Sequence, residues 1–267
     1  MIDLHSHILP EMDDGAENLD MSLTMLSMAS KGGTTTMVAT PHVIGESVCP
    51  EWETIVQETK VLNREAACRG IAVTLYPGAE VAIDLEFLNK ISGPGPYCLN
   101  GGRYMLVELP AREIPGWTDE FFFYLQTKEI IPILAHPERH PEIQQKPEQL
   151  LEWIHKGILV QINAGSLKGQ WGTKVKKAAQ LLVLNQLVHA FGSDAHSTGT
   201  RNPNLGYLKT TVQSLQRNRS IEKLFGDYPS AIVNDRDFCV SEVPESLSYK
   251  DGKWNGIKNC LSRWIGR

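Results

Sequence analysis

The chain has 267 residues, of which 42% are hydrophobic and 21% charged, which is enough for one large domain with a buried core. Its formal net charge of -5 argues against binding to nucleic-acid backbones or anionic lipid, so no nucleic-acid partner is expected. Since no apolar run is long enough to span a membrane and the first residues do not read as a secretory leader, we expect a cytoplasmic protein with no transmembrane segment.

The elements follow one rhythm, in which short apolar, β-branched segments alternate with amphipathic helical stretches. This alternation predicts parallel strands joined by crossover helices, hence an α/β barrel. Helical periodicity is clearest over residues 52–66 and 150–154. Seven strands are predicted, one fewer than in the usual eight-stranded barrel: Ile2–His5, Thr35–Thr40, Ile71–Tyr76, Tyr104–Val107, Ile130–Leu134, Ile158–Ile162 and Val188–Phe191.

The barrel rhythm stops at about Asp227. Near the end of the chain, Ile257, Leu261 and Trp264 recur at helical spacing. We therefore expect a barrel domain over residues 1–226 and a C-terminal extension over 227–267, packed on the barrel or at an oligomer contact.

Thiol chemistry is not indicated. The five cysteines form no C-x-x-C pair and are odd in number, which favours reduced thiols. None is followed by an arginine at the C-x5-R spacing of a cysteine phosphatase; after Cys98, Arg103 comes one residue early.

Two histidines, His5 and His7, close the first predicted strand. Residues i and i+2 of a strand share a face, so both imidazoles can reach one ion. The same residue types then recur at the ends of later strands, except the sixth, which runs into Asn163. Because barrel enzymes build their sites at the carboxyl ends of the strands, these residues should converge. The candidate metal ligands are His5, His7, Asp14, His42, Glu80, Glu108, His136, Asp194 and His196.

Nine ligands are too many for one ion, which takes about four to six. They suit two or three ions with bridging carboxylates, and we expect three. Imidazole and carboxylate without thiolate indicate Mn²⁺, Fe or Zn²⁺. His140, His155 and His189 lie off the strand-end pattern and are expected to be structural or solvated.

Several segments resemble the polymerase-and-histidinol-phosphatase (PHP) superfamily, and within it the manganese-dependent bacterial protein-tyrosine phosphatases of capsule and exopolysaccharide operons. The resemblance extends from Met1 to about Tyr207. The segments that carry it are residues 2–10 (IDLHSHILP), 13–16 (DDGA), 39–42 (ATPH), 135–139 (AHPER), 163–166 (NAGS), 193–196 (SDAH) and 198–201 (TGTR).

The resemblance implies a distorted seven-stranded (β/α) barrel of the PHP fold, three metal ions, most often Mn, and the ligand role for the nine residues named above. It implies that Arg139 and Arg201 bind phosphate. It further implies that the substrate is the phosphotyrosine tail of a bacterial tyrosine kinase that controls capsule or exopolysaccharide synthesis. Whether the protein forms a homo-oligomer is left open.

Such a site would carry a net positive charge and draw in a phosphomonoester dianion. A bridging water with a lowered pKa would supply hydroxide for in-line attack on phosphorus. Trp171 could line the opening of the site, although a packing role explains it equally well.

Two other readings stay open. One is a small-molecule phosphatase of the histidinol-phosphate type, or a nucleotide phosphodiesterase, on the same fold. The other is a metal-stabilised regulatory domain without turnover; the two candidate phosphate-binding arginines argue against it.

Overall fold

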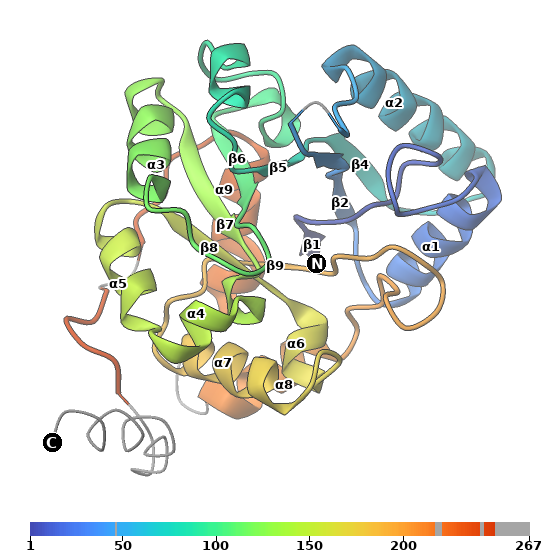
Figure 1. Cartoon of the computed structure of the whole chain (residues 1–267). Helices are drawn as coiled ribbons and strands as arrows, with labels where there is room; N and C mark the ends of the chain where they lie inside the picture. Colours follow the sequence, from blue (N-terminus) through green and yellow to red (C-terminus); the bar gives the residue numbers. More distant parts are fainter. Residues whose placement is uncertain (46, 217–220, 241–242, 249–267) are drawn as a thin grey trace, which may run out of the picture.

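Parallel strands surround the centre of the molecule, and most helices lie on their outer side (Figure 1). The computed structural model describes residues 1–45, 47–216, 221–240 and 243–248. Every strand pair in it is parallel. The fold is thus a mixed α/β fold with a curled parallel sheet. None of its described helices has the length and apolar character of a membrane span.

The strands form two sheets, with the orders β1-β2-β4 and β3-β5-β6-β7-β8-β9. The free edges of the two sheets meet where Ser6 pairs with Ala195 in a parallel bridge and the Asp194 amide donates to the carbonyl of His5 at 2.9 Å. The strands are β1 (Ile2–Asp3), β2 (Thr36–Ala39), β3 (His42–Val43), β4 (Thr74–Pro77), β5 (Glu80–Ala82), β6 (Tyr104–Glu108), β7 (Ile131–Ala135), β8 (Leu159–Asn163) and β9 (Ala190–Gly192).

All seven predicted strands are present, with ends shifted by up to three residues, but β3 and β5 were not predicted. β3 follows β2 after a break at Pro41, which has no N–H for a strand ladder. β5 follows β4 after Gly78, where a Cβ would lie 2.9 Å from side chains of Val38 and Leu99. The breaks place His42 and Glu80 in register with each other across β3 and β5.

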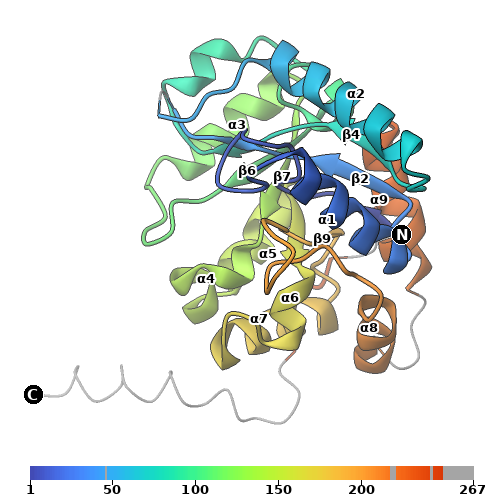
Figure 2. The ribbon, with the colours of Figure 1, turned by 90° about the vertical axis from the view of Figure 1, so that its right-hand side faces the viewer.

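The helices connect the strands and cover them, as the alternating pattern predicted (Figures 1 and 2). The two clearest helical patterns correspond to α2 and α5. The helices are α1 (Leu19–Lys31), α2 (Trp52–Cys68), α3 (Thr118–Thr127), α4 (Pro141–Gln145), α5 (Glu148–His155), α6 (Ala164–Lys168), α7 (Thr173–Leu184), α8 (Leu208–Gln216) and α9 (Tyr228–Val233). Short 3-10 turns lie at Phe87–Lys90, Leu99–Gly101 and Pro137–Arg139, and a π-helical turn lies at Lys223–Asp227.

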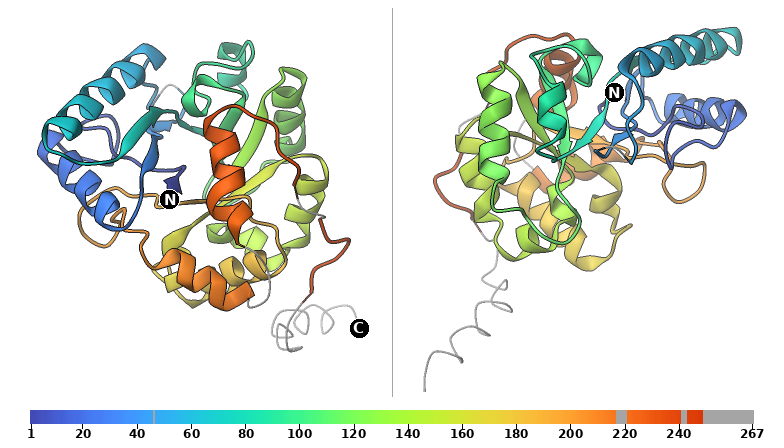
Figure 3. Two further views of the ribbon diagram at one scale, coloured as in Figure 1. Left: turned by 180° about the vertical axis from the view of Figure 1, so that it is seen from behind. Right: turned by 45° about the horizontal axis from the view of Figure 1, so that its top comes forward.

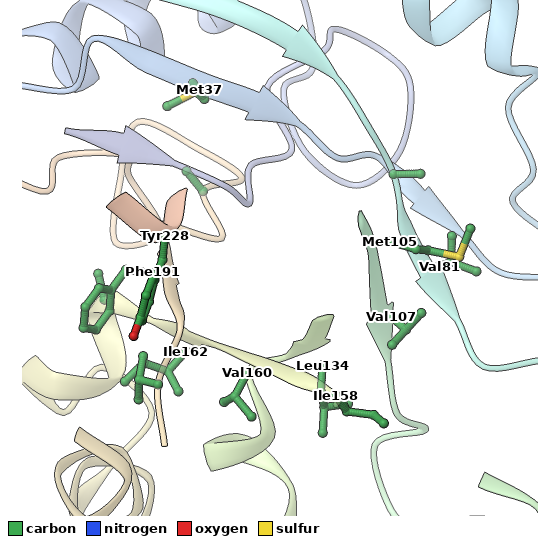
Figure 4. Close-up of a cluster of buried hydrophobic side chains, with 14 of the residues drawn as sticks. Met37, Val81, Met105, Val107, Leu134, Ile158, Val160, Ile162, Phe191 and Tyr228 are labelled. Carbon is green, nitrogen blue, oxygen red and sulfur yellow. The ribbon is translucent and has the colours of Figure 1, made fainter. Parts of the chain in front are cut away.

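Two hydrophobic clusters divide the core, because successive side chains of a strand point to opposite faces. The larger cluster packs the outer faces of the strands against the helices; Figure 4 shows part of it, including Met105, Val107, Leu134 and Val160. The smaller cluster, which we call the inner cluster, fills the space inside the curled sheet. Its members are Leu4, Val38, Leu99, Tyr104, Leu106, Ile133, Ala135, Leu159, Ala190, Ile232 and Val233.

Helix α9 contributes the last two members of the inner cluster. Seen from behind, it lies across the strands on the side of the N-terminus (Figure 3, left). Asn100 donates a hydrogen bond to the Val233 carbonyl at 2.9 Å, and the Tyr104 hydroxyl donates to the Arg236 carbonyl at 2.7 Å. The domain boundary at residue 226 stays a prediction. The helical pattern of residues 257–264 lies outside the described residues.

Candidate metal centre

The carboxyl ends of the strands bring all nine predicted ligands together; we call these nine side chains the central cluster. Seven of them form three overlapping groups, in each of which the candidate ligand atoms lie within 4.8 Å of one another. The groups are His7, Asp14, His42 and His196; His5, His7 and Glu80; and His42, Glu80 and Glu108.

The other two predicted ligands, His136 and Asp194, border these groups. His136 Nε2 lies 2.8 Å from Glu80 Oε1 and 3.5 Å from Glu108 Oε1. Asp194 Oδ1 lies 3.7 Å from His5 Nε2 and 3.6 Å from His7 Nε2. Both residues have a left-handed backbone, with φ of 32° at His136 and 51° at Asp194. Non-glycine residues in this region carry strain, which is common at functional sites.

Glu80 lies at the middle of the cluster and is buried. Its Oε2 is 3.2 Å from His5 Nε2, 3.3 Å from His7 Nε2 and 3.1 Å from His42 Nδ1. Burial opposes ionisation, but the surrounding imidazoles outweigh it and hold the pKa of Glu80 well below its usual range. Glu108 differs: burial first and the neighbouring Glu80 second raise its pKa to about 8.

These residues fit divalent cations. Buried His42 Nδ1, Glu80 Oε2 and His196 Nε2 lie close to other cluster atoms but make no hydrogen bond among the described residues, and buried polar atoms without hydrogen bonds are costly. The Nε2 atoms of His5 and His7 lie only 3.1 Å apart, so their lone pairs need a proton or a cation between them. Imidazole nitrogen and carboxylate oxygen are ligands for Zn²⁺, Fe and Mn²⁺.

Asp13, which the sequence reasoning did not single out, orients His7. Its Oδ2 lies 2.6 Å from His7 Nδ1 and accepts from the His42 amide at 2.9 Å, while Oδ1 accepts from the Gly15 amide. Burial opposes both charges, yet the contact lowers the pKa of Asp13 to about 2 and helps raise that of His7 to about 10. A carboxylate on the outer nitrogen of a histidine leaves Nε2 to face a metal. The feature of the sequence that could have indicated this role is the adjacent carboxylate pair Asp13 and Asp14.

The sixth predicted strand, β8, supports the cluster through two buried amides that were also missed. Gln161 Oε1 lies 3.0 Å from His5 Nδ1, and Gln161 Nε2 donates to Asn163 Oδ1 at 3.0 Å. Asn163 Nδ2 in turn donates to Asp194 Oδ2 at 2.7 Å. Since an amide oxygen only accepts, His5 Nδ1 carries a proton and its Nε2 lone pair faces the cluster.

Glu138, also missed, holds the start of α6. It is buried, and its Oε1 accepts from Ser166 Oγ at 2.6 Å and from the Asn163 amide at 3.0 Å. Burial raises the pKa of Glu138 to about 7. The contact fixes the backbone from which the Asn163 side chain reaches Asp194.

The two predicted phosphate-binding residues meet at Asp194. Arg139 Nη1 donates to Asp194 Oδ2 at 2.8 Å, and Arg201 Nη2 donates to Asp194 Oδ1 at 2.6 Å. Burial opposes the charge on Asp194, but His5 and other nearby positive groups hold its pKa below its usual range. Within the described part of the chain, these are the only hydrogen bonds that either guanidinium donates, so each keeps further N–H groups for an anion.

Trp171 stacks on Arg139. The guanidinium carbon lies 5.0 Å from the centre of the indole ring, within the range of a cation–π contact. Gly165 makes room for this ring, because a Cβ there would lie 2.9 Å from Trp171. The tryptophan therefore borders the site.

Comparison with known proteins gives consistent matches. The family model described as "Capsular polysaccharide synthesis, CpsB/CapC" matches residues 1–234. A putative tyrosine-protein phosphatase CapC of Staphylococcus aureus is 32% identical over 96% of this chain and 100% of its own length. The tyrosine-protein phosphatase YwqE of Bacillus subtilis is 37% identical over 76% of this chain and 80% of its own. CpsB of Streptococcus pneumoniae, also named a tyrosine-protein phosphatase, is 28% identical over 88% and 99%.

One solved structure matches over nearly the whole chain. It comes from a study of YwqE from Bacillus subtilis and CpsB from Streptococcus pneumoniae, described there as "unique metal-dependent tyrosine phosphatases". The TM-score is 0.84 at 30% identity, and the match covers 93% of this chain and 100% of the other.

Proposed function

Because this chain belongs to the CpsB/CapC family of capsular polysaccharide synthesis, we propose that it is a metal-dependent protein-tyrosine phosphatase. Its relatives are named tyrosine-protein phosphatases, and the matching structure is of metal-dependent ones. The observation that carries the proposal is the position of two guanidinium groups on Asp194, next to a cluster of imidazoles and carboxylates that fits divalent cations.

The three groups of ligand atoms support a site for three metal ions, for which Mn²⁺ is the proposed metal. The proposed ligands are His5, His7, Asp14, His42, Glu80, Glu108, His136, Asp194 and His196. The groups share His7, His42 and Glu80, as expected for neighbouring ions with common ligands. When bound, such ions polarise phosphoryl oxygens and lower the pKa of water to near neutrality.

The chain's own residues bind and orient the substrate. Arg139 and Arg201 keep N–H groups with which they can hold the equatorial oxygens of a phosphoryl group. Asp194 keeps both guanidiniums in place, and the cationic forks stabilise the negative charge that builds up on these oxygens. A phenol has a pKa near 10, so tyrosine is a good enough leaving group to depart without a protein acid.

The fold is then a distorted seven-stranded (β/α) barrel of the PHP type with a C-terminal extension after residue 226. In this reading β2 with β3, and β4 with β5, each represent one interrupted strand. The proposed substrate is the phosphotyrosine tail of a tyrosine kinase that controls capsule synthesis. The proposed location of the reaction is the cytoplasm. The family description, which concerns capsular polysaccharide, supports this partner.

The test is hydrolysis of a phosphotyrosyl peptide by the full chain loaded with Mn²⁺, beside histidinol phosphate and a nucleotide diester. We expect the peptide to be the best substrate, chelation to abolish the activity and added Mn²⁺ to restore it. A preference for either small molecule would contradict the assignment to protein substrates. Activity that resists chelation but is lost on thiol alkylation would contradict the metal-dependent reaction itself.

A further inference from the structure

A pocket of about 100 Å³ opens beside the central cluster, between the carboxyl ends of β6 and β7. On its inner side lie Glu108 and His136, both from the cluster, together with Arg139. Leu109, Ala111 and Pro137 supply apolar lining. The pocket thus joins a charged end to an apolar wall.

The two walls of the pocket are held together by His140. Its Nδ1 accepts from the Glu142 amide at 3.2 Å, so the proton lies on Nε2, which donates to the Pro110 carbonyl at 3.0 Å. Glu142 Oε1 also accepts from the Ile114 amide at 2.8 Å. These bonds join the segment after β6 to the start of α4, and Figure 2 shows that segment projecting on the same side of the molecule as α4. The pocket is therefore formed before any ligand arrives.

We propose that this pocket receives the aromatic ring of the phosphate ester, with Leu109, Ala111 and Pro137 as the surface against which the ring packs. The inference rests on the proposed function and identifies the residues that distinguish an aryl phosphate from an alkyl phosphate. In such an ester one oxygen joins ring and phosphorus, so the ring must lie directly beside the phosphoryl site. The pocket has that place, because Arg139 and two cluster residues line it.

Size and polarity agree with a ring. A closed cavity of about 150 Å³ holds a whole benzene molecule, so an open pocket of about 100 Å³ suits one ring that stands partly in solvent. Ala111 is exposed and Leu109 is 6% exposed, so a ring entering the pocket would cover apolar surface and leave one edge in water. Serine and threonine phosphates have no ring to fill it.

The test compares binding of phenylphosphonate and methylphosphonate to the full chain loaded with Mn²⁺, by titration calorimetry. Neither probe is hydrolysed; phenylphosphonate carries the ring, and methylphosphonate carries a methyl group in its place. We expect phenylphosphonate to bind about tenfold more tightly, the effect of one partly buried ring. The variant Ala111→Phe fills the pocket with its own ring and should remove this difference, while methylphosphonate binding stays within about twofold.

The matched control is Ala67→Phe, which adds the same ring at an exposed position of α2 and should leave both affinities unchanged. The proposal is overturned if Ala111→Phe leaves the preference for phenylphosphonate intact, or if it weakens both probes equally. It is also overturned if the KM of a phosphotyrosyl peptide rises while both phosphonate affinities stay as in wild type, since the pocket would then hold a flanking residue. Each of these results leaves turnover of phosphotyrosine by the wild-type chain, and hence the proposed function, untouched.

Discussion

Hydrogen bonds from outside the central cluster decide which nitrogen of His5 and which nitrogen of His7 faces the cluster. Gln161 fixes His5 in this way and Asp13 fixes His7. Neither partner has to be a ligand. Such outer contacts commonly change metal affinity by about tenfold to a hundredfold when removed.

Gln161→Leu should therefore weaken Mn²⁺ binding by about tenfold to a hundredfold, because His5 loses the partner that fixes its tautomer and Asn163 loses a donor. Titration calorimetry on the metal-free protein measures the effect. Gln216→Leu is the control, since Gln216 is another buried amide, which donates to the Val183 carbonyl away from the cluster. Equal metal affinities in the two variants would show that Gln161 is only a packing residue.

Arg139 combines a fork, an ion pair with Asp194 and a stacking contact with Trp171. Arg139→Lys keeps the charge but loses the planar fork and the stacking. We expect kcat/KM for a phosphotyrosyl peptide to fall by about a hundredfold, the usual effect of removing one donor to a transition-state oxyanion. Circular dichroism should show an unchanged fold, and a variant within tenfold of wild type would contradict the assigned role.

Trp171→Ala tests the stacking contact separately. Without the indole, the Arg139 guanidinium loses a cation–π contact worth roughly 0.5–2 kcal/mol, so we expect kcat/KM to fall by about threefold to thirtyfold. Trp171→Phe should recover most of the loss. Phe238→Ala is the control, because Phe238 stacks on Tyr104 and Tyr228 near α9, away from the cluster. If Trp171→Phe does not restore kcat/KM, stacking on Arg139 does not explain the effect of Trp171→Ala.

The sequence placed the nine predicted ligands at strand ends, and the structure brings those side chains together; their role as ligands stays a prediction. Asp13, Gln161, Asn163 and Glu138 were missed for a physical reason. An amide or a second carboxylate is common in any sequence, and only its orientation toward a neighbour distinguishes it. Orientation follows from packing between distant strands, which periodicity does not describe.

At the level of elements, strong patterns were read correctly. The seven β-branched segments and the two clearest amphipathic helices are present. The strands β3 and β5 have two and three residues, too few for a recognisable alternation. Helix α9 has six residues, and its place in the inner cluster depends on contacts with β1 and with the 3-10 turn Leu99–Gly101 that no local pattern reveals.

Helix α9 should nevertheless contribute strongly to stability. Ile232 is fully buried in the inner cluster, so Ile232→Ala should lower the free energy of unfolding by about 2–5 kcal/mol. Phe123→Ala is the control, because Phe123 is 68% exposed on α3 and its loss should change stability little. Urea unfolding followed by circular dichroism measures both. Equal midpoints would show that α9 is not part of the core.

The molecule as a whole should become less stable below neutral pH. Buried His189 accepts from the Val160 amide at Nδ1, and burial lowers its pKa from 6.5 to about 4. A histidine with a lowered pKa binds its proton more tightly in the unfolded chain. Its neutral form therefore supports folding fully above about pH 6.5, and this support is lost as the pH falls toward 4, by about 3 kcal/mol in total.

His189→Asn keeps an acceptor for Val160 but cannot take up a proton. We expect the variant to lose less stability than wild type between pH 7.5 and 4.5, measured by urea unfolding of metal-free protein. The imidazoles of the central cluster titrate in both proteins, so the difference between them reports on His189. Parallel losses would mean that His189 is solvated rather than buried.

The central claim is that imidazoles and carboxylates from strands far apart in sequence hold divalent cations at one end of the molecule. The most direct measurement is an anomalous-difference map from crystals of the full chain grown with Mn²⁺. We predict peaks within about 2.3 Å of donor atoms of Glu80, His7 and His42, where the three groups overlap. Manganese bound only at exposed surface carboxylates, with none among these side chains, would contradict the account.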